Sequence, residues 1–443
     1  MIILYLVISV ILIILLTARY KVHPFLALFM VAIVYGLLAG MSLELIVESI
    51  NQGFGNTLGS IGLIILFGVI IGAFLENSGA AYVLAEKILK AIGRKRVGPG
   101  MGIIGYFISI PVFADSGFIL LSPLNKSLTK KAKLSLAGTA VALGLGLTAS
   151  HTMLPPTPGP IAAAGILNAD LGLVMLIGLP VSLLALTAGI IFAVKVAART
   201  KIEPNPGTTD AEIQERVKQA PGALHASFPV LVPIVLIIMK SLTEGLNLLP
   251  EGNLYQFILF IGDPVIALMI GVFLAFTLPK NLTPKMLSSS GWMGKAIETS
   301  ASVIMITGAG GIFGMILQNS GIADVLGELL ADVHLGIFLP FLLTAAIKTA
   351  QGSSTVALIT AASIMMPMMD SLGFETEMQK ALVVLAIGAG SAVVSHANDS
   401  FFWVVTQLTG MTTKTGYKLY TTGTLILGST AAIIVFILYQ IVA

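Results

Sequence analysis

Five ionisable residues stand out because they interrupt stretches of sequence that are otherwise almost entirely apolar. They are Asp115, His151, Lys348, His396 and Asp399. Burying a charged group in a membrane is expensive, so an ionisable side chain found there is a functional candidate by default. Histidines and carboxylates can take up and release protons, and a lysine can attract a carboxylate. The five residues could therefore bind a small charged solute and couple its movement to that of a proton.

The composition of the chain indicates that these residues lie in a membrane protein. The 443 residues are 56% hydrophobic and only 10% charged, whereas soluble domains carry roughly 25% charged residues. Long apolar runs without alternation predict helices rather than a β-barrel. A net charge of +3 does not imply nucleic acid as a partner, and the lack of cysteine excludes disulfides and thiolate sites. We predict an all-α integral membrane protein with no metal and no cofactor.

One interruption of the apolar pattern spans residues 147–160 and contains four prolines and a glycine. Proline removes a backbone donor and breaks a helix. Irregular backbone at membrane depth is tolerated only where it lines a cavity enclosed by protein. Discontinuous helices of this kind form the substrate sites of many transporters. We predict a broken transmembrane helix over about 134–167, with Ser150, His151 and Thr152 at the site.

A short apolar segment before this helix predicts a re-entrant hairpin. Residues 101–114 are too few, at ~1.5 Å per residue, to cross ~30 Å of hydrocarbon, and basic residues flank the segment on both sides. A hairpin over about 99–125 that enters and leaves on the cytoplasmic side explains both facts. Its tip carries Asp115, Ser116 and Gly117.

The second half of the chain repeats this plan. The sequence ENSGAAYVL at 76–84 is matched by QNSGIADVL at 318–326, and Ser150-His151 is matched by Ser395-His396. We predict a second hairpin over about 336–369 and a second broken helix over about 381–409. The residues expected at the site from this half are Lys348, Thr349, Gln351, Gly352, Ser353, Ser354, Ser395, His396, Asn398 and Asp399.

The charged loops predict that the two repeats, 1–197 and 226–443, have opposite orientations. The loops around the first hairpin are basic and those around the second are acidic, and basic loops stay in the cytoplasm. The first repeat also has an odd number of predicted crossings, which independently inverts the second. A polar cytoplasmic linker, 198–225, joins the repeats, and both termini are predicted outside. The predicted full spans are 2–17, 24–40, 58–76, 171–194, 226–240, 259–278, 299–317 and 420–441.

Each candidate residue also has a structural interpretation. Asp115 could cap a helix, the two histidines could be satisfied core residues, and Lys348 could extend its side chain toward the membrane surface. Asp399 could pair internally with a threonine or a backbone N–H. The proton-coupling candidates are Asp115, His151, His396 and Asp399. The small-residue pair Gly68 and Gly72 is interpreted as ordinary helix packing.

These motifs resemble those of the gluconate:proton symporter family. The resemblance covers essentially the whole chain and rests on the paired Asn-Ser-Gly motifs, PVFADSG at 111–117, SHTMLPPTPGP at 150–160 and SHANDS at 395–400. It implies a symporter of the bacterial inner membrane for gluconate or a related sugar acid, with another small hydroxy acid or D-serine as alternatives. Similarity to the wider ion transporter superfamily implies a homodimer in membrane lipid and elevator-like alternating access. In this interpretation Lys348 and half-helix N-termini bind the carboxylate.

Three rival interpretations are weighed by whether the sequence contains the motifs that each requires. An intramembrane hydrolase is disfavoured because the chain has neither a Gly-x-Ser-x-Gly elbow nor a His-Glu-x-x-His motif. A channel is disfavoured because the potassium-filter sequence is missing. Sodium coupling stays open, since hydroxyls and carbonyls at helix breaks can hold Na⁺.

Overall fold

The computed structural model describes residues 2–93, 96–205, 220–246, 248–250, 252–322, 325 and 335–442. Within these residues the chain is helical and forms no strand, which confirms the predicted all-α class. Several helices are long and apolar enough to cross a membrane, as expected of a multi-pass membrane protein. They are α3 (Leu43–Asn77), α9 (Leu171–Lys195), α11 (Ala223–Gly245), α15 (Trp292–Asn319) and α22 (Thr422–Val442).

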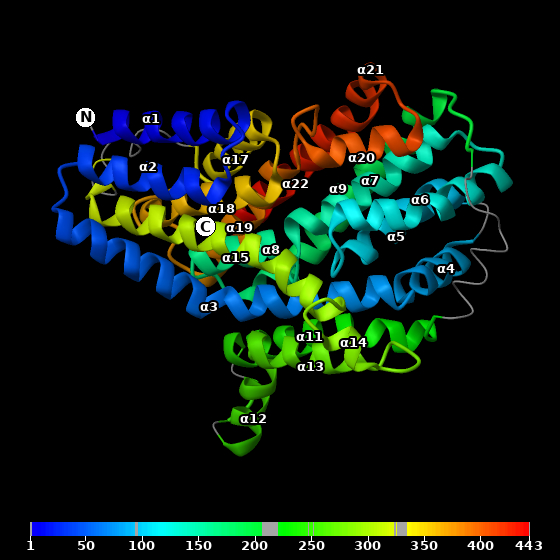
Figure 1. Ribbon diagram of the computed structural model, residues 1–443, viewed down its shortest axis with the longest axis horizontal. Coiled ribbons are helices and arrows are strands. Elements are labelled where there is room, and N and C mark those ends of the chain that lie inside the picture. The colour runs from blue at the N-terminus through cyan, green and yellow to red at the C-terminus, as the bar shows by residue number, and fades with distance from the viewer. Residues whose placement is uncertain are drawn as a thin grey trace.

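The two longest of these helices, α3 and α15, pack along each other and end in the same way (Figure 1). Each ends at an Asn-Ser-Gly motif whose glycine has a positive φ, 78° at Gly79 and 74° at Gly321. Glycine adopts this conformation without steric cost and so ends a helix. Their contact is close, because a Cβ on Gly53 would lie 2.5 Å from the Gly311 carbonyl oxygen.

The largest differences from the predicted spans are at α3 and at the predicted span 259–278. The predicted span 58–76 begins 15 residues earlier, as α3, so that Glu44 and Glu48 lie in its first two turns, and Glu44 in the first turn is favoured by the helix dipole. The predicted single span 259–278 is two helices, α12 (Asn253–Gly262) and α13 (Pro264–Phe276), which meet at an angle of 65°. Asp263 caps α13 by accepting a hydrogen bond from the backbone N–H of Val265 at 3.0 Å.

Both predicted hairpins are pairs of helices joined by a short turn. The first is α5 (Val97–Ser109) and α6 (Ala114–Lys131), and the second is α17 (Phe338–Gln351) and α18 (Ser354–Met365). Both lie close to the sequence ranges predicted for them. That they re-enter on one side of the membrane remains a prediction.

The two predicted broken helices each consist of two helical pieces. The first is α7 (Leu136–Met153) and α8 (Pro158–Ile166), and the second is α19 (Glu377–Ala392) and α20 (Ser400–Thr409). The first break is shorter than its four prolines suggest, because Pro158 and Pro160 begin α8. Proline is tolerated in the first turn of a helix, where its missing N–H would have no helical partner.

Several pairs of equivalent helices in the two halves make equivalent contacts, and several contacts between the halves have a counterpart in which the halves change places. In each half the first hairpin arm packs on the first piece of the broken helix, α5 on α7 and α17 on α19. Across the halves, α18 packs on α8 and α6 packs on α20. Likewise α2 (Pro24–Leu38) contacts α15 and α13 contacts α3. These exchanges support a duplicated plan, whereas the inversion of one half relative to the other remains a prediction.

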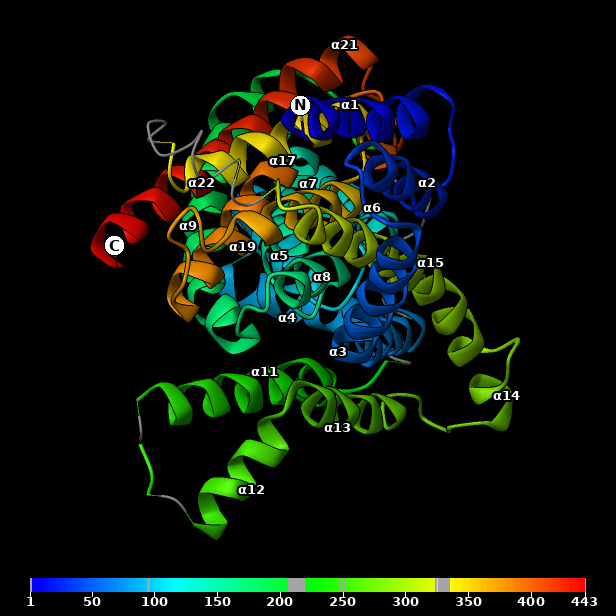
Figure 2. The same cartoon turned by 90° about the vertical axis from the view of Figure 1, so that its left-hand side faces the viewer.

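The helices that follow the linker lie to one side of this body. In both views α11 and α13 form a separate layer and α12 projects away from the bundle (Figures 1 and 2). The other described helices include α1 (Ile2–Ile14) and the amphipathic α4 (Ala80–Ile92). Half of the predicted linker, and most of the stretch that corresponds to α4 in the second half, lie outside the described residues.

Candidate functional site

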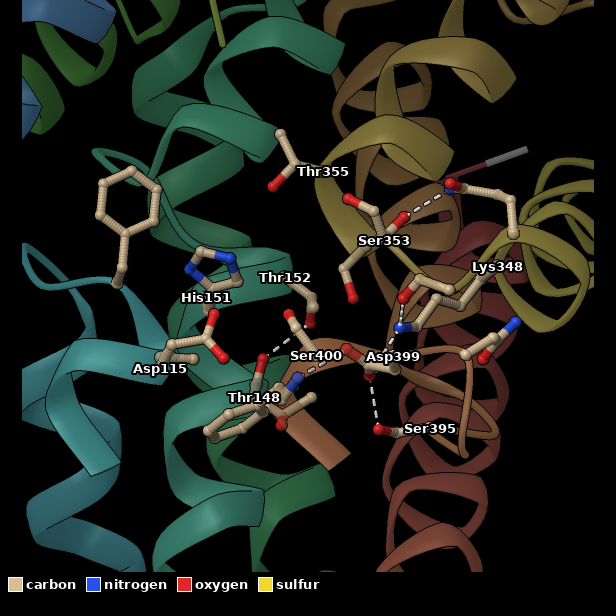
Figure 3. A pocket seen from close by; sticks show the side chains of 18 of the residues that line it. Asp115, Thr148, His151, Thr152, Lys348, Ser353, Thr355, Ser395, Asp399 and Ser400 are labelled. Atoms are coloured by element: carbon tan, nitrogen blue, oxygen red, sulfur yellow. Dashed lines mark hydrogen bonds and ion pairs between the residues drawn. The ribbon is translucent and has the colours of Figure 1, made fainter. Parts of the chain in front are cut away.

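A pocket of about 260 Å³ lies where the irregular segments of the two halves meet (Figure 3). The first half contributes the N-terminus of α6 and the last turns of α7. The second half contributes the α17–α18 turn, the break between α19 and α20, and the π-helical turn η5 (Tyr417–Thr421). Ligand pockets usually measure ~300–1,000 Å³, so this one suits a small solute.

The structure brings most of the predicted site residues together at this pocket. Those that line it are Asp115, His151, Thr152, Lys348, Gln351, Gly352, Ser353, Ser354, Ser395, Asn398 and Asp399. Those outside the lining are Ser116, Gly117, Ser150, Thr349 and His396.

A buried ion pair occupies the part of the pocket wall made by the second half. Lys348 Nζ lies 2.7 Å from Asp399 Oδ2 and also donates to the carbonyl oxygen of Gly352. Ser395 Oγ donates to the same carboxylate oxygen at 2.5 Å, and the N–H of Phe401 donates to Oδ1 at 3.0 Å. Only 1% of Lys348 is exposed. Lys348 therefore does not reach for the membrane surface, and Asp399 has the internal pairing considered as its structural role.

The first half contributes polar atoms that lack such partners. Asp115 Oδ1 and His151 Nδ1 are buried and have no hydrogen-bond partner in the described part of the chain. Asp115 is not the N-cap of α6, since Phe113 takes that position. Figure 3 shows Asp115 and His151 on one side of the pocket and Lys348 on the other. Unpaired buried polar atoms cost free energy, so this side is suited to receive a solute group or a proton.

The α17–α18 turn is fitted closely to the second break. Gly352 has a φ of 96°, and a Cβ there would lie 2.2 Å from the carbonyl oxygen of Asn398. The carbonyl oxygen of Thr349 accepts a hydrogen bond from Asn398 Nδ2 at 2.8 Å and lies 2.8 Å from His396 Nε2. Thr349 and His396 thus support the pocket from behind.

The two Ser-His pairs do not occupy equivalent places. His151 lies in the last turn of α7, whereas His396 lies in irregular backbone beyond the end of α19. The ring of His151 is 6.0 Å from that of Phe113 and borders the pocket, while the ring of His396 is 6.4 Å from that of Tyr417. The matching Ser-His pairs therefore do not hold equivalent positions. The reason is that α7 ends two residues after His151, whereas α19 ends before Ser395.

Two pocket residues, Thr148 and Tyr420, were missed by the sequence analysis. Thr148 Oγ1 lies 2.9 Å from the hydroxyl oxygen of Tyr420, which links α7 to η5 across the pocket. π-Helical turns are rare and often occur at functional sites. Thr148 lies within the interruption at 147–160 but before the residues chosen from it, and Tyr420 stands at the start of the predicted span 420–441. The remaining lining residues outside the predicted set are Phe113, Ala114, Thr355, Ala392, Ser400 and Phe401.

Comparison with known proteins identifies the family of this chain. Residues 1–442 match the sequence model of a family described as GntP family permease. The chain belongs to the GntP family of permeases. This is a family of transporters rather than of enzymes.

Similar GntP permeases differ in the substrates their names record. The chain is 34% identical to the gluconate permease of Pseudomonas aeruginosa over 445 residues, covering 97% of this chain and 96% of that one. It is 35% identical to the D-serine transporter DsdX of Escherichia coli K12 over 447 residues, with coverage of 99% and 98%. It is 32% identical to the high-affinity gluconate transporter of the same strain over 409 residues, with coverage of 91% and 92%.

The fold is similar to that of a solved transporter structure. The Alcanivorax borkumensis YdaH transporter, whose crystal structure was described as revealing an unusual topology, has a TM-score of 0.58 with this chain. The sequence identity is 13%, and the match covers 88% of this chain and 87% of the other. At this identity the likeness concerns the fold alone.

Proposed function

We propose that this GntP permease imports a small hydroxylated carboxylate, gluconate or a related sugar acid, by proton symport across the bacterial inner membrane. The observation that carries the proposal is the convergence of helix N-termini on the pocket. Ala114, Ser354 and Ser400 are the first residues of α6, α18 and α20, and all three line it. Helix N-termini present free N–H groups and a partial positive charge, which favour an anion.

The polar side chains of the pocket match the rest of such a substrate. The described lining includes the hydroxyls of Thr148, Thr152, Ser353 and Thr355, which can exchange hydrogen bonds with a row of substrate hydroxyls. Lys348 supplies a positive charge for the carboxylate, shared with Asp399. Asp115, with its unpartnered oxygen, is the proton site we favour, and His151, His396 and Asp399 are the other candidates.

The movement we propose is elevator-like alternating access in a homodimer embedded in membrane lipid. Its support is the arrangement of the pocket between two hairpins and two broken helices that pack across the halves. Inverted repeats, which we predict for the two halves, allow one site to face either side of a membrane in turn. The separate layer formed by α11 and α13 is the part we assign to the stationary scaffold.

A second candidate substrate is D-serine or another small hydroxylated amino acid. The specific observation in its favour is the unpartnered, buried Oδ1 atom of Asp115, which an ammonium group could fill. The match to a D-serine transporter along nearly the whole chain agrees with this alternative.

Uptake into proteoliposomes tests the proposed function. Labelled gluconate is offered with and without an inward proton gradient, in the absence of sodium, with unlabelled glycerate, lactate or D-serine as competitors. We expect gradient-driven accumulation that unlabelled gluconate blocks. Accumulation only with sodium would overturn proton coupling, and no accumulation of labelled gluconate with either ion gradient would overturn the substrate.

A further inference from the structure

We propose that Asp115 sets the coupling of this permease: it carries the proton when the substrate is a plain carboxylate, and it binds the ammonium group when the substrate is an amino acid. The inference rests on the proposed function and assigns one residue two alternative uses. It predicts that sugar acids move with a proton and that zwitterions move without one.

The charges on the pocket wall are the basis of the proposal. In the described lining the charged or titratable groups that face Asp115 are His151 from α7, Lys348 from α17, Asp399 from the second break and Tyr420 from η5. Lys348 and Asp399 are in contact and cancel each other's charge. With neutral His151 and Tyr420, an ionised Asp115 leaves the empty pocket with one net negative charge.

This balance makes a second negative charge unfavourable. A bound sugar acid would place its carboxylate in a confined pocket that already holds an unbalanced carboxylate, where repulsion is poorly screened. Protonation of Asp115 removes that repulsion. The pocket loaded with one anion and one proton then carries the same net charge as the empty pocket.

An amino acid satisfies the same balance without a proton. Its carboxylate takes the place of the sugar acid's carboxylate, near Lys348 and the helix N-termini, while its ammonium group supplies the positive charge that the proton supplied. The unpartnered Oδ1 of Asp115 gives the ammonium group an acceptor. The loaded pocket again has the charge of the empty one. Both kinds of transport are therefore electroneutral at the site.

The first test follows the pH inside proteoliposomes loaded with a pH-sensitive dye. For the wild-type protein we expect gluconate entry to acidify the lumen with one proton per molecule and D-serine entry to leave the lumen pH unchanged. Acidification by both substrates would overturn the proposal, since the proton would then have another carrier such as His151. Failure of D-serine to compete with gluconate would also overturn it. No gluconate uptake at all would instead be a failure of the proposed function.

The second test uses Asp115→Asn, whose amide resembles the protonated acid. Exposed Asp370→Asn is the control for loss of a carboxylate elsewhere. We expect Asp115→Asn to exchange external for internal gluconate within about 3-fold of the wild-type rate, but to lose proton-driven accumulation. Competition by D-serine should weaken by about 100-fold, since its ammonium partner is gone. Proton-driven accumulation retained in Asp115→Asn would overturn the inference while leaving the transport function intact.

Discussion

Lys348 is the basic residue of the described pocket lining, and its burial makes it dependent on Asp399. Breaking a buried ion pair by removing one partner typically costs ~3–5 kcal/mol, because the other charge is left uncompensated. We expect Lys348→Met to lower the free energy of unfolding in detergent by about that amount. The double variant Lys348→Met/Asp399→Asn should recover most of the loss, yet neither variant should take up substrate.

The control for this comparison is the exposed pair of Lys380 and Glu377, whose charged atoms are 2.9 Å apart. Surface pairs contribute only ~0–1 kcal/mol, so Lys380→Met should leave both stability and uptake close to the wild-type values. If the double variant were as unstable as Lys348→Met alone, the ion pair would not be the source of the effect.

Tyr420 tests whether a residue invisible to sequence analysis contributes to binding. Tyr420→Phe removes a hydroxyl that contacts Thr148 at the pocket, while Thr148 keeps its bond to the Gly144 carbonyl oxygen at 2.9 Å. A hydrogen bond contributes ~0.5–1.5 kcal/mol, so KM should rise about 3- to 10-fold with little change in expression. Tyr106→Phe is the matched control, because the Tyr106 hydroxyl bonds to Ser182 away from the pocket. Tyr106→Phe should lower stability and leave KM unchanged. An equal rise of KM in Tyr106→Phe and Tyr420→Phe would contradict a binding role for Tyr420.

At the scale of elements, Gly68 and Gly72 of α3 pack against irregular backbone rather than against another helix. A Cβ on Gly72 would lie 2.0 Å from the carbonyl oxygen of Pro111 at the first hairpin turn, and one on Gly68 would lie 2.8 Å from that of Pro156 in the first break. The two glycines therefore set how closely α3 approaches the first hairpin turn, next to Asp115, and the first break, next to His151. The interpretation as ordinary helix packing was too general.

Alanine substitutions along α3 separate this role from general effects on the helix. Gly68→Ala and Gly72→Ala should displace the hairpin turn and the break, and so reduce uptake at least about 10-fold. Gly59 and Gly62 lie on the same helix, and a Cβ on either meets nothing within 4 Å. Gly59→Ala and Gly62→Ala should therefore preserve uptake, and as better helix formers they should stabilise the protein slightly. Equal uptake by all four variants at equal expression would contradict the spacing role.

The elements were predictable where a local rule dictates them. The first hairpin followed from a segment too short to cross a membrane, the first break followed from clustered proline and polar residues, and their counterparts in the second half followed from the repeated motifs. The extent of α3 was not predictable, because Glu44 and Glu48 look like loop residues until Ser42 is seen to cap the helix before them. The partners of Lys348 and Thr148 depend on contacts between distant segments, which no spacing within one segment encodes.

At the scale of the whole molecule, the orientation of the two halves can be measured directly because the chain has no cysteine. Lys130 lies in the last turn of α6, at the end of the first hairpin, whereas Asp370 follows the second hairpin, and both are exposed. If the halves are inverted, Asp370→Cys should react with an impermeant maleimide in intact cells, whereas Lys130→Cys should react only after the membrane is opened. Labelling of both from the same side would contradict the inversion.

The packing of α8 on α18 and of α6 on α20 has a consequence for biosynthesis. When the ribosome has finished the first half, neither α8 nor α6 has met its partner, because α18 and α20 are still to be made. At roughly 5–20 residues per second, α8 waits on the order of ten seconds or more for α18. During that interval Asp115 and His151 must be shielded from lipid by something other than the finished pocket. Until the second half arrives, the first half lacks the helices that complete the pocket around these two residues.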